Sequence, residues 1–107
     1  MGRIVLVTGV SRYLGGRLAA LLAADPGIDR VIGVDVVAPR MPLGGVDFVR
    51  ADIRSPVIAK VLGEAEVDTV VHMGVLATPR QAGGRSAMKE INVIGTMQLL
   101  AACQRTS

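Results

Sequence analysis

Short apolar runs alternate with amphipathic stretches along the chain. The first run, Ile4–Thr8, is a continuous aliphatic segment, typical of a parallel strand that is buried on both faces. Apolar residues at helical spacing follow it, and Asp25-Pro26-Gly27 ends that stretch. The same alternation is repeated further along, so the pattern predicts a series of strand and helix units.

These runs predict four strands, at Ile4–Thr8, Arg30–Asp35, Val46–Arg50 and Val67–His72. Three helices accompany them. We expect the first to bury a leucine stripe made of Leu14, Leu18, Leu21 and Leu22. The second starts with Ser55 as N-cap and Pro56 as first helical residue, and its buried side comprises Val57, Ile58, Val61 and Leu62. The third and longest helix covers Ser86–Arg105.

Glycine and proline mark two predicted loops, Val36–Gly45 and Gly74–Gly84. Strands that alternate with helices favour a parallel sheet with helices on its faces. The chain has 107 residues, which is the length of one domain. The sequence therefore predicts a single α/β domain over residues 1–107.

Composition removes several classes of function. The 12 Lys and Arg residues are scattered, and Tyr13 and Phe48 are the only aromatic residues, so the sequence offers no platform for nucleic acid. No apolar run approaches the roughly 20 residues that span a membrane. The single cysteine, Cys103, excludes an internal disulfide and a zinc ligand set, which favours the reducing cytoplasm.

The turn after the first strand carries the candidate chemistry. Its sequence, Thr8-Gly9-Val10-Ser11-Arg12-Tyr13-Leu14-Gly15, joins a buried strand to a helix. In a dinucleotide site one glycine makes the tight turn, a second lets the backbone approach the pyrophosphate, and a third allows close helix packing. Gly9 and Gly15 fill the first and third roles, whereas Arg12 or Tyr13 stands in place of the second. Backbone N–H groups at the start of the helix would then bind the phosphates.

An acidic residue ends the second strand, as a dinucleotide site requires. Asp35 is suited to accept hydrogen bonds from both ribose hydroxyls, and its charge would repel a 2′-phosphate. The residue therefore favours NAD over NADP. The alternative is a surface carboxylate at a strand end.

Four motifs in order resemble the N-terminal part of the NAD-dependent epimerase/dehydratase family, the extended short-chain dehydrogenases/reductases. The family's TGxxGxxG loop reads TGVSRYLG here, and its aspartate and apolar residue after strand three match Asp52 and Ile53. Its VVHxA segment matches 70–74, and its NVxGTxxLLxAC helix matches 92–103. The resemblance implies a Rossmann-like, doubly wound parallel sheet with strand order 3-2-1-4, truncated after the fourth strand and its following helix.

The resemblance also implies a role for each matching residue. Tyr13 and Leu14 would present backbone N–H groups to the pyrophosphate, and Asp35 would hold the adenosine ribose. Asp52 would accept from the adenine amino group, with Ile53 beside the ring. The remaining residues implied are Met73, Gly74 and Val75, along the path toward the nicotinamide, and Asn92, which would bond to the backbone.

Plainer roles stay open for several of these residues. Asp52 can cap the turn before Pro56, and Met73 can serve packing alone. His72, on a buried strand, is more often a satisfied core histidine than a base. Cys103 fits a small core residue in an apolar helix.

Arg12 leaves two alternatives open. The loop also resembles the TGASRGIG loop of other short-chain reductases, whose arginine holds an NADP 2′-phosphate. Arg12 can fold outward and pair with phosphate, or it can crowd the site and weaken binding.

The family's catalytic YxxxK segment does not occur in these 107 residues, since Tyr13 is the only tyrosine. We therefore expect the NAD-binding portion of a longer enzyme that acts on a nucleotide sugar or related small molecule, and is catalytically incomplete as given. The alternatives are a non-catalytic dinucleotide sensor and an interaction module that has lost its cofactor. A homodimer is expected through the Ser86–Arg105 helix, the edge of the fourth strand, or both.

Overall fold

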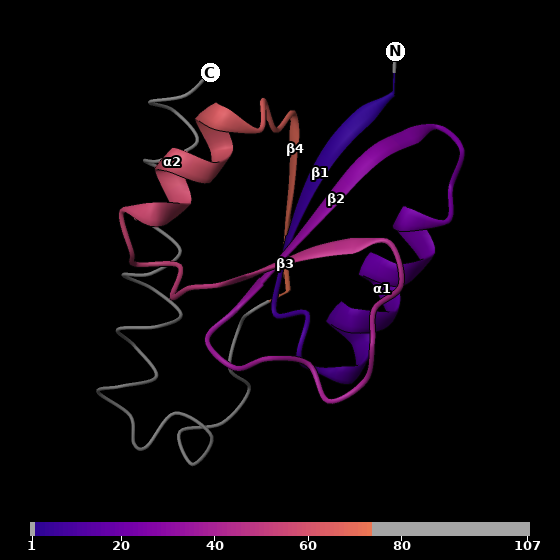
Figure 1. The fold of residues 1–107 in the computed structure, drawn as a ribbon, viewed down its shortest axis with the longest axis horizontal. Helices are drawn as coiled ribbons and strands as arrows, with labels where there is room; N and C mark the ends of the chain where they lie inside the picture. Colours follow the sequence, from indigo (N-terminus) through magenta and orange to yellow (C-terminus); the bar gives the residue numbers. More distant parts are fainter. Residues whose placement is uncertain (1, 74–107) are drawn as a thin grey trace.

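The computed structural model describes residues 2–73, which form six elements (Figure 1). They are β1 (Arg3–Thr8), α1 (Tyr13–Ala23), β2 (Ile28–Asp35), β3 (Val46–Arg50), α2 (Val57–Glu64) and β4 (Thr69–His72). The predicted Gly74–Gly84 loop and Ser86–Arg105 helix lie outside the described residues. The four predicted strands, the first two helices and the long loop between β2 and β3 are confirmed.

The strands form one parallel sheet in the order β3-β2-β1-β4, as predicted. Thr8, the last residue of β1, pairs with Val34 on one side and with His72 on the other. Asp35, which ends β2, pairs with Arg50, which ends β3. All four strands therefore reach the same carboxyl edge of the sheet.

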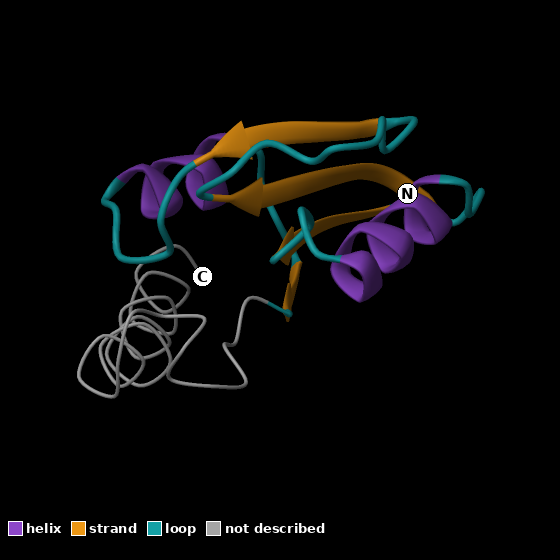
Figure 2. Ribbon diagram, turned by 90° about the horizontal axis from the view of Figure 1, so that it is seen from below, coloured by secondary structure: helices purple, strands orange, loops and turns teal. Residues whose placement is uncertain are grey.

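The two helices cover opposite faces of the sheet (Figure 2). Neighbouring residues of a strand point to opposite faces. Leu6 and Ile32 pack with Ile58 and Leu62 of α2, whereas Val5, Val7 and Val31 pack with Ala19 of α1. Both faces are covered, so β1 is buried from Val5 to Thr8 and the fold is doubly wound and Rossmann-like.

The predicted leucine stripe of α1 is wrong for Leu14 and Leu21, whereas Leu18 and Leu22 are half-buried. The residues that α1 buries are Gly15, Gly16 and Ala19, whereas Leu14 and Leu21 are 67% and 62% exposed. The reason is close packing: a Cβ on Gly16 would lie 2.6 Å from the carbonyl oxygen of Val10. The helix therefore turns its small residues inward. Of the stripe, Leu22 is half-buried and packs against the α1-side core.

Element boundaries differ from the prediction by one or two residues. β2 begins at Ile28 because Ile28 pairs with Arg3, where β1 has a register irregularity. β4 begins at Thr69. Before it, Asp68 donates its backbone N–H to the carbonyl of Ile4 and accepts the N–H of Ile4 on its carboxylate, both at 3.0 Å. α2 begins at Val57 after Pro56, although the Ser55 hydroxyl does accept the Val57 N–H, at 3.2 Å. Ile58 and Leu62 are buried as predicted, but Val57 is exposed.

Candidate functional site

The predicted site residues within the described part of the chain gather at the carboxyl edge of the sheet. Gly9 follows β1, Asp35 ends β2, Asp52 follows β3 and Met73 follows β4. The strands are adjacent and parallel, so these positions lie side by side in the order of the sheet. Gly74, Val75 and Asn92 lie outside the described residues.

The glycine turn has the tight geometry that the spacing predicts. Gly9 has a φ of +76°, in the left-handed region that favours glycine. Its N–H donates to Val34 of β2, and its carbonyl accepts the N–H of Arg12, at 2.9 and 3.2 Å. A Cβ on Gly15 would lie 2.2 Å from the Gly9 carbonyl oxygen. The first and third glycine roles are therefore confirmed as structural requirements of this turn.

Arg12 stands where the second glycine is missing, and its backbone is unstrained. It is the N-cap residue of α1, with φ −92° and ψ 157°, extended values that any L-residue adopts. Its carbonyl accepts the first helical hydrogen bond, from Gly16 at 2.8 Å. The side chains of Arg12 and Tyr13 are exposed. Arg12 in place of the second glycine therefore introduces no backbone strain into the turn.

The start of α1 is suited to bind an anion. N–H groups in the first turn of a helix lack intrahelical partners. The N-cap side chain makes no hydrogen bond to them, and the first turn holds no acidic residue. The first turn therefore places no acidic side chain of its own at the positive end of the helix dipole, and the N–H groups of Tyr13 and Leu14 belong to this turn.

Asp35 ties the glycine turn to the end of β2. Its Oδ2 accepts the backbone N–H of Ser11 at 3.1 Å, and its Oδ1 accepts that of Val36 at 2.7 Å. The Ser11 hydroxyl in turn donates to the carbonyl of Val37. Each carboxylate oxygen retains a lone pair for a further donor. Ser11 was missed by sequence reasoning, although a hydroxyl inside a glycine turn often makes such backbone contacts.

Asp52 sits in a tight turn and binds Arg54. Its Oδ1 accepts both the backbone N–H and the Nε of Arg54, each at 2.9 Å, and its Oδ2 accepts a terminal guanidinium nitrogen at 2.6 Å. This hydrogen bonding lowers the pKa of the Asp52 carboxyl against a smaller opposing effect of burial. The turn-capping role is therefore observed, and Arg54 is a partner that the sequence reading did not assign. Ile53, in the same turn, is half-buried.

His72 and Thr8 join β1 and β4 at the centre of the edge. The Thr8 hydroxyl and Nδ1 of His72 are 2.6 Å apart, and Thr8 is 1% exposed. Burial lowers the pKa of His72, so the imidazole is neutral near pH 7. His72 is thus half-buried and hydrogen-bonded, and its role as a core histidine rather than a base stays a prediction. Met73 packs beside the α1-side core, as its packing role predicts.

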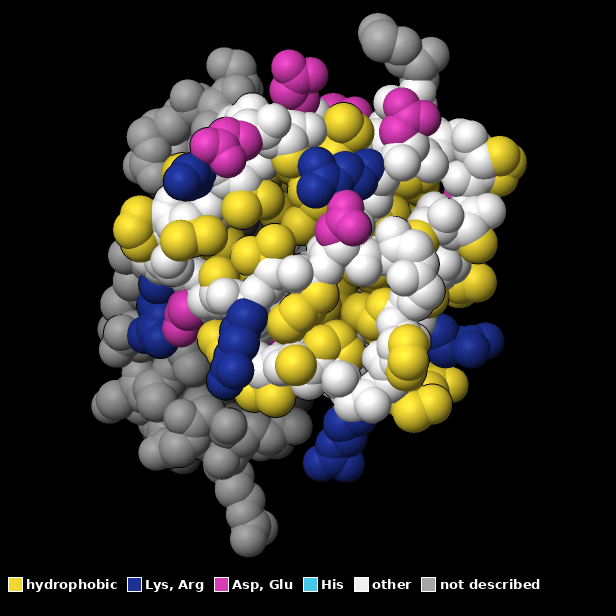
Figure 3. Space-filling view, viewed as in Figure 1, with side chains coloured by type: hydrophobic (Ala, Val, Ile, Leu, Met, Phe, Trp, Pro, Cys, Tyr) yellow, Lys and Arg dark blue, Asp and Glu magenta, His cyan; other side chains and the backbone are white. Residues whose placement is uncertain are grey.

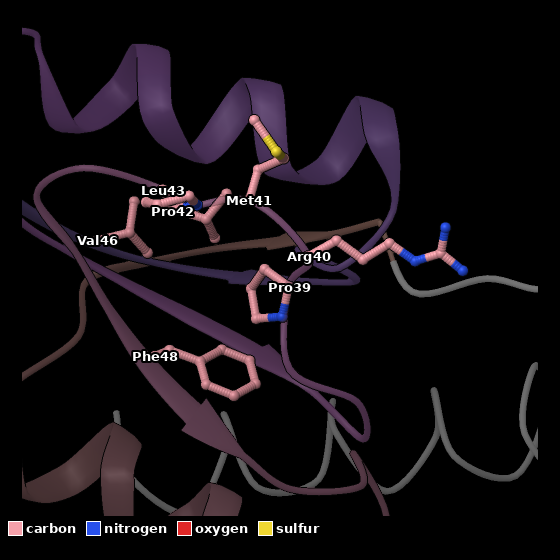
Figure 4. Close-up of a pocket in the computed structure, with 7 residues that line it drawn as sticks. All are labelled: Pro39, Arg40, Met41, Pro42, Leu43, Val46 and Phe48. Carbon is pink, nitrogen blue, oxygen red and sulfur yellow. The ribbon is translucent and has the colours of Figure 1, made fainter.

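Two pockets flank the Pro39–Leu43 segment of the loop between β2 and β3. The larger, of about 400 Å³, lies between that segment and α1, and it reaches the glycine turn at Ser11. The smaller, of about 330 Å³, is lined also by Val46 and Phe48 of β3. Figure 4 shows Met41 directed toward α1 and Arg40 pointing away from the Phe48 ring. Arg12, Arg17 and Arg40 line the larger pocket, and none of its lining residues within 2–73 is acidic.

The surface charge agrees with the sequence reading. On the face in Figure 3, Lys and Arg side chains are scattered, with apolar side chains between them. Within residues 2–73, no helix has the length and apolar character needed to cross a membrane. The same residues hold no group of three or more His, Cys, Asp or Glu that could bind a metal ion.

A doubly wound parallel sheet, a glycine turn leading into an uncapped helix and an acid at the end of β2 together define a dinucleotide-binding α/β fold. The sequence profile of the NAD dependent epimerase/dehydratase family matches residues 5–107. The chain therefore belongs to that family.

Curated relatives extend well beyond the matched region. An uncharacterised protein of Mycobacterium tuberculosis is 53% identical over 107 residues, which cover 96% of this chain and 28% of the relative. Short-chain dehydrogenase/reductase family 42E member 1 of Homo sapiens is 36% identical over 104 residues, covering 94% of this chain and 26% of that protein. The chain thus spans about a quarter of the length of these relatives.

Solved structures share the fold. A dTDP-glucose 4,6-dehydratase of Streptomyces venezuelae, solved with NAD bound, has a TM-score of 0.79 and 29% identity, over 96% of this chain and 36% of that one. A UDP-glucose 4-epimerase of Thermus thermophilus in complex with NAD has a TM-score of 0.80 and 28% identity, over 96% of this chain and 34% of that one. The chain accordingly has a nicotinamide-dinucleotide-binding fold.

Proposed function

We propose that this chain is the NAD-binding portion of an NAD-dependent epimerase, dehydratase or reductase that acts on a nucleotide sugar or related small molecule. The observation that carries the proposal is the contact between Asp35 and the glycine turn, through the N–H of Ser11. It brings a carboxylate acceptor for ribose hydroxyls next to the helix N-terminus that would take the pyrophosphate.

The residues present fit the dinucleotide. The space that a Cβ on Gly15 would fill is needed for the turn itself, and the first turn of α1 holds no acidic residue. Gly9 and Arg12 would shape the pyrophosphate contact, and Tyr13 and Leu14 would donate backbone N–H groups to it. Asp35 would hold the ribose and Asp52 the adenine amino group beside Ile53. Met73, Gly74, Val75 and Asn92 would complete the path toward the nicotinamide.

NAD supplies hydride transfer when it is bound, and this chain's part is to hold and orient it. A general acid and base must reach the reacting atoms for turnover. The 107 residues contain no YxxxK segment, and Tyr13, their one tyrosine, is 77% exposed at the start of α1. We therefore infer that the chain as given binds NAD without turnover, and that substrate is bound in the full-length enzyme.

The same observation supports the alternative, a non-catalytic dinucleotide-sensing or regulatory module. Both functions require cofactor binding, and a YxxxK segment in the longer reading frame separates them. Loss of cofactor binding would instead leave an interaction module, with Arg12 as the disabling residue. We further propose cytoplasmic localisation, supported by the single cysteine, a homodimer, and no nucleic-acid or membrane partner.

Calorimetric titration of the chain with NAD and with NADP tests the proposal. We expect NAD to bind more tightly, because the Asp35 carboxylate accepts from ribose hydroxyls and repels a 2′-phosphate. Asp35→Asn should weaken the binding of NAD by about 1–3 kcal/mol, the scale of hydrogen bonds to a charged group. It should also reduce the preference of the chain for NAD over NADP.

Asp47→Asn is the matched control, since Asp47 lies near the start of β3 in an ion pair with Arg30. It should leave both affinities unchanged. Equal affinity of the unmutated chain for the two dinucleotides would contradict the assignment of NAD. Binding of neither would contradict the proposed function.

A further inference from the structure

Arg54 donates more hydrogen bonds to one oxygen of the Asp52 carboxylate than to the other. Oδ1 receives two hydrogen bonds, from the backbone N–H and the Nε of Arg54. Oδ2 receives one, from a terminal guanidinium nitrogen. A carboxylate oxygen offers two lone-pair positions. Oδ1 is therefore filled, and one position on Oδ2 remains.

This remaining acceptor is both accessible and fixed in direction. The side chains of Asp52 and Arg54 are each 32% exposed, so an incoming group can reach the pair. Arg54 binds the carboxylate in a fork, which fixes the plane of its two oxygens. The backbone N–H of Arg54 on Oδ1 and the N–H of Ser55 on the Asp52 carbonyl hold the turn beneath it.

We propose that Arg54 is a positioning residue that directs the free lone pair of Asp52 Oδ2 at the 6-amino group of adenine and so makes the site selective for adenine. This role rests on the proposed function, in which Asp52 accepts from the adenine amino group. A purine with a 6-oxo group presents an acceptor at that position, so an ionised carboxylate rejects it.

Arg54 also keeps the carboxyl in the form that this selection needs. A protonated carboxyl would present an O–H donor, which can pair with a 6-oxo group as well. The guanidinium of Arg54 favours the ionised, acceptor-only form. The orientation and the ionised state of the Asp52 carboxylate thus both favour an amino group over an oxo group at position 6 of the purine.

A merely structural role for Arg54 makes a different prediction. Arg54→Gln removes the guanidinium but keeps both backbone hydrogen bonds of the turn. If the side chain only stiffened the turn, the variant would weaken every dinucleotide by the same factor. If the Arg54 side chain directs Asp52, the variant should lose affinity mainly for the dinucleotide that carries the amino group.

The experiment titrates the chain with NAD and with nicotinamide hypoxanthine dinucleotide, which has an oxo group in place of the 6-amino group. The unmutated chain should prefer NAD by about 10-fold or more, as a hydrogen bond to a charged group provides. Arg54→Gln should lower this ratio several-fold, mainly through weaker NAD binding. Arg54→Lys, which keeps the charge without the fork, should give an intermediate ratio.

Arg50→Gln is the matched control, because Arg50 lies at the same edge and its Nε donates to the carbonyl of Val36 rather than to Asp52. It should leave the ratio unchanged. An unchanged ratio in Arg54→Gln, or an equal loss for both dinucleotides, overturns the role of Arg54 while the proposed function stands. Failure of the unmutated chain to bind NAD overturns both. If Arg54→Gln does not fold, the ratio in Arg54→Lys decides in the same way.

Discussion

At the scale of single residues, contacts with backbone atoms define the site. Gly15 faces the carbonyl of Gly9, Asp35 faces the N–H of Ser11, and Asp52 faces the N–H of Arg54. Such contacts depend on a few tenths of an ångström. Small changes of side chain should therefore have effects that depend strongly on position.

Gly15→Ala should destabilise the chain by about 1–3 kcal/mol, the scale of overpacking, because its Cβ would lie 2.2 Å from the Gly9 carbonyl oxygen. Gly45→Ala is the control, since its Cβ would meet only the Cβ of Ala23, at 3.8 Å. Urea unfolding of both variants measures the difference. Equal stability of the two variants would contradict the packing described for this turn.

The half-buried position of His72 predicts a pH dependence of stability. Its pKa in the folded chain is below 6.5, so the unfolded chain binds the proton at higher pH. The free energy of unfolding should therefore fall as the pH drops below about 6.5, by at most about 1.4 kcal/mol per pH unit, and level off below the folded pKa. His72→Asn should flatten this dependence between pH 8 and 5.5.

The contribution of His72 to the pH dependence of stability can be distinguished from that of the carboxylates. The pKa values of Asp52 and Asp68 are lowered by hydrogen bonds from Arg54 and Ile4, so the stability they contribute is lost only as the pH falls below about 4. Unfolding measured above pH 5.5 avoids that range. A variant that keeps the full slope there would exclude His72 as its source.

Spacing and residue type were enough to predict the positions of Gly9, Gly15 and Asp35, because strand ends and tight turns restrict which residues fit. The contacts of Ser11 and Arg54 were not predictable in this way. They depend on which side-chain rotamer meets which backbone group after the chain has folded. The spacing of apolar residues along the sequence does not indicate such contacts.

At the scale of elements, strands were easier to predict than helix faces. The apolar run of β1 is buried as expected, because a central parallel strand is covered on both faces. In α1 the helical period placed leucines inward, but the close approach to Gly9 and Val10 requires Gly15 and Gly16, and the helix fully buries these two residues and Ala19. Tertiary packing thus overrode hydrophobicity in this helix.

Two leucine substitutions test these faces. Leu62→Ala, in α2 and 3% exposed, should lower the free energy of unfolding by about 2–5 kcal/mol, as removal of a buried leucine does. Leu21→Ala, in α1 and 62% exposed, should change it by less than about 0.5 kcal/mol. Denaturant unfolding compares the two. A comparable cost at Leu21 would support the leucine stripe that the sequence predicted.

At the scale of the whole molecule, the sheet has two ends, and β4 forms one of them within the described residues. The order 3-2-1-4 was predictable from the family resemblance and the handedness of crossovers. Within the described residues, β4 has a strand neighbour, β1, on one side only. An edge strand presents backbone groups that can pair with another chain.

We therefore predict self-association of the 107-residue chain. The predicted helix Ser86–Arg105 carries Val93, Met97 and Ala101 off its main apolar stripe, which leaves apolar surface for a partner. Sedimentation at tens of micromolar, an order-of-magnitude working concentration, should show a dimer. Met97→Glu should weaken it without changing NAD affinity. Monomer alone at that concentration would contradict the prediction.

The central position of β1 has a consequence for synthesis. β1 leaves the ribosome first, but its β4 neighbour lies 64 residues later in the chain, as the pairing of Thr8 with His72 shows. At a synthesis rate of about 5–20 residues per second, β4 is completed roughly 3–13 s after β1. During this time the side of β1 that pairs with β4 lacks its strand partner, and no charged residue from Ile4 to Thr8 opposes pairing with another chain. Shielding of this strand during translation should therefore favour the yield of folded protein.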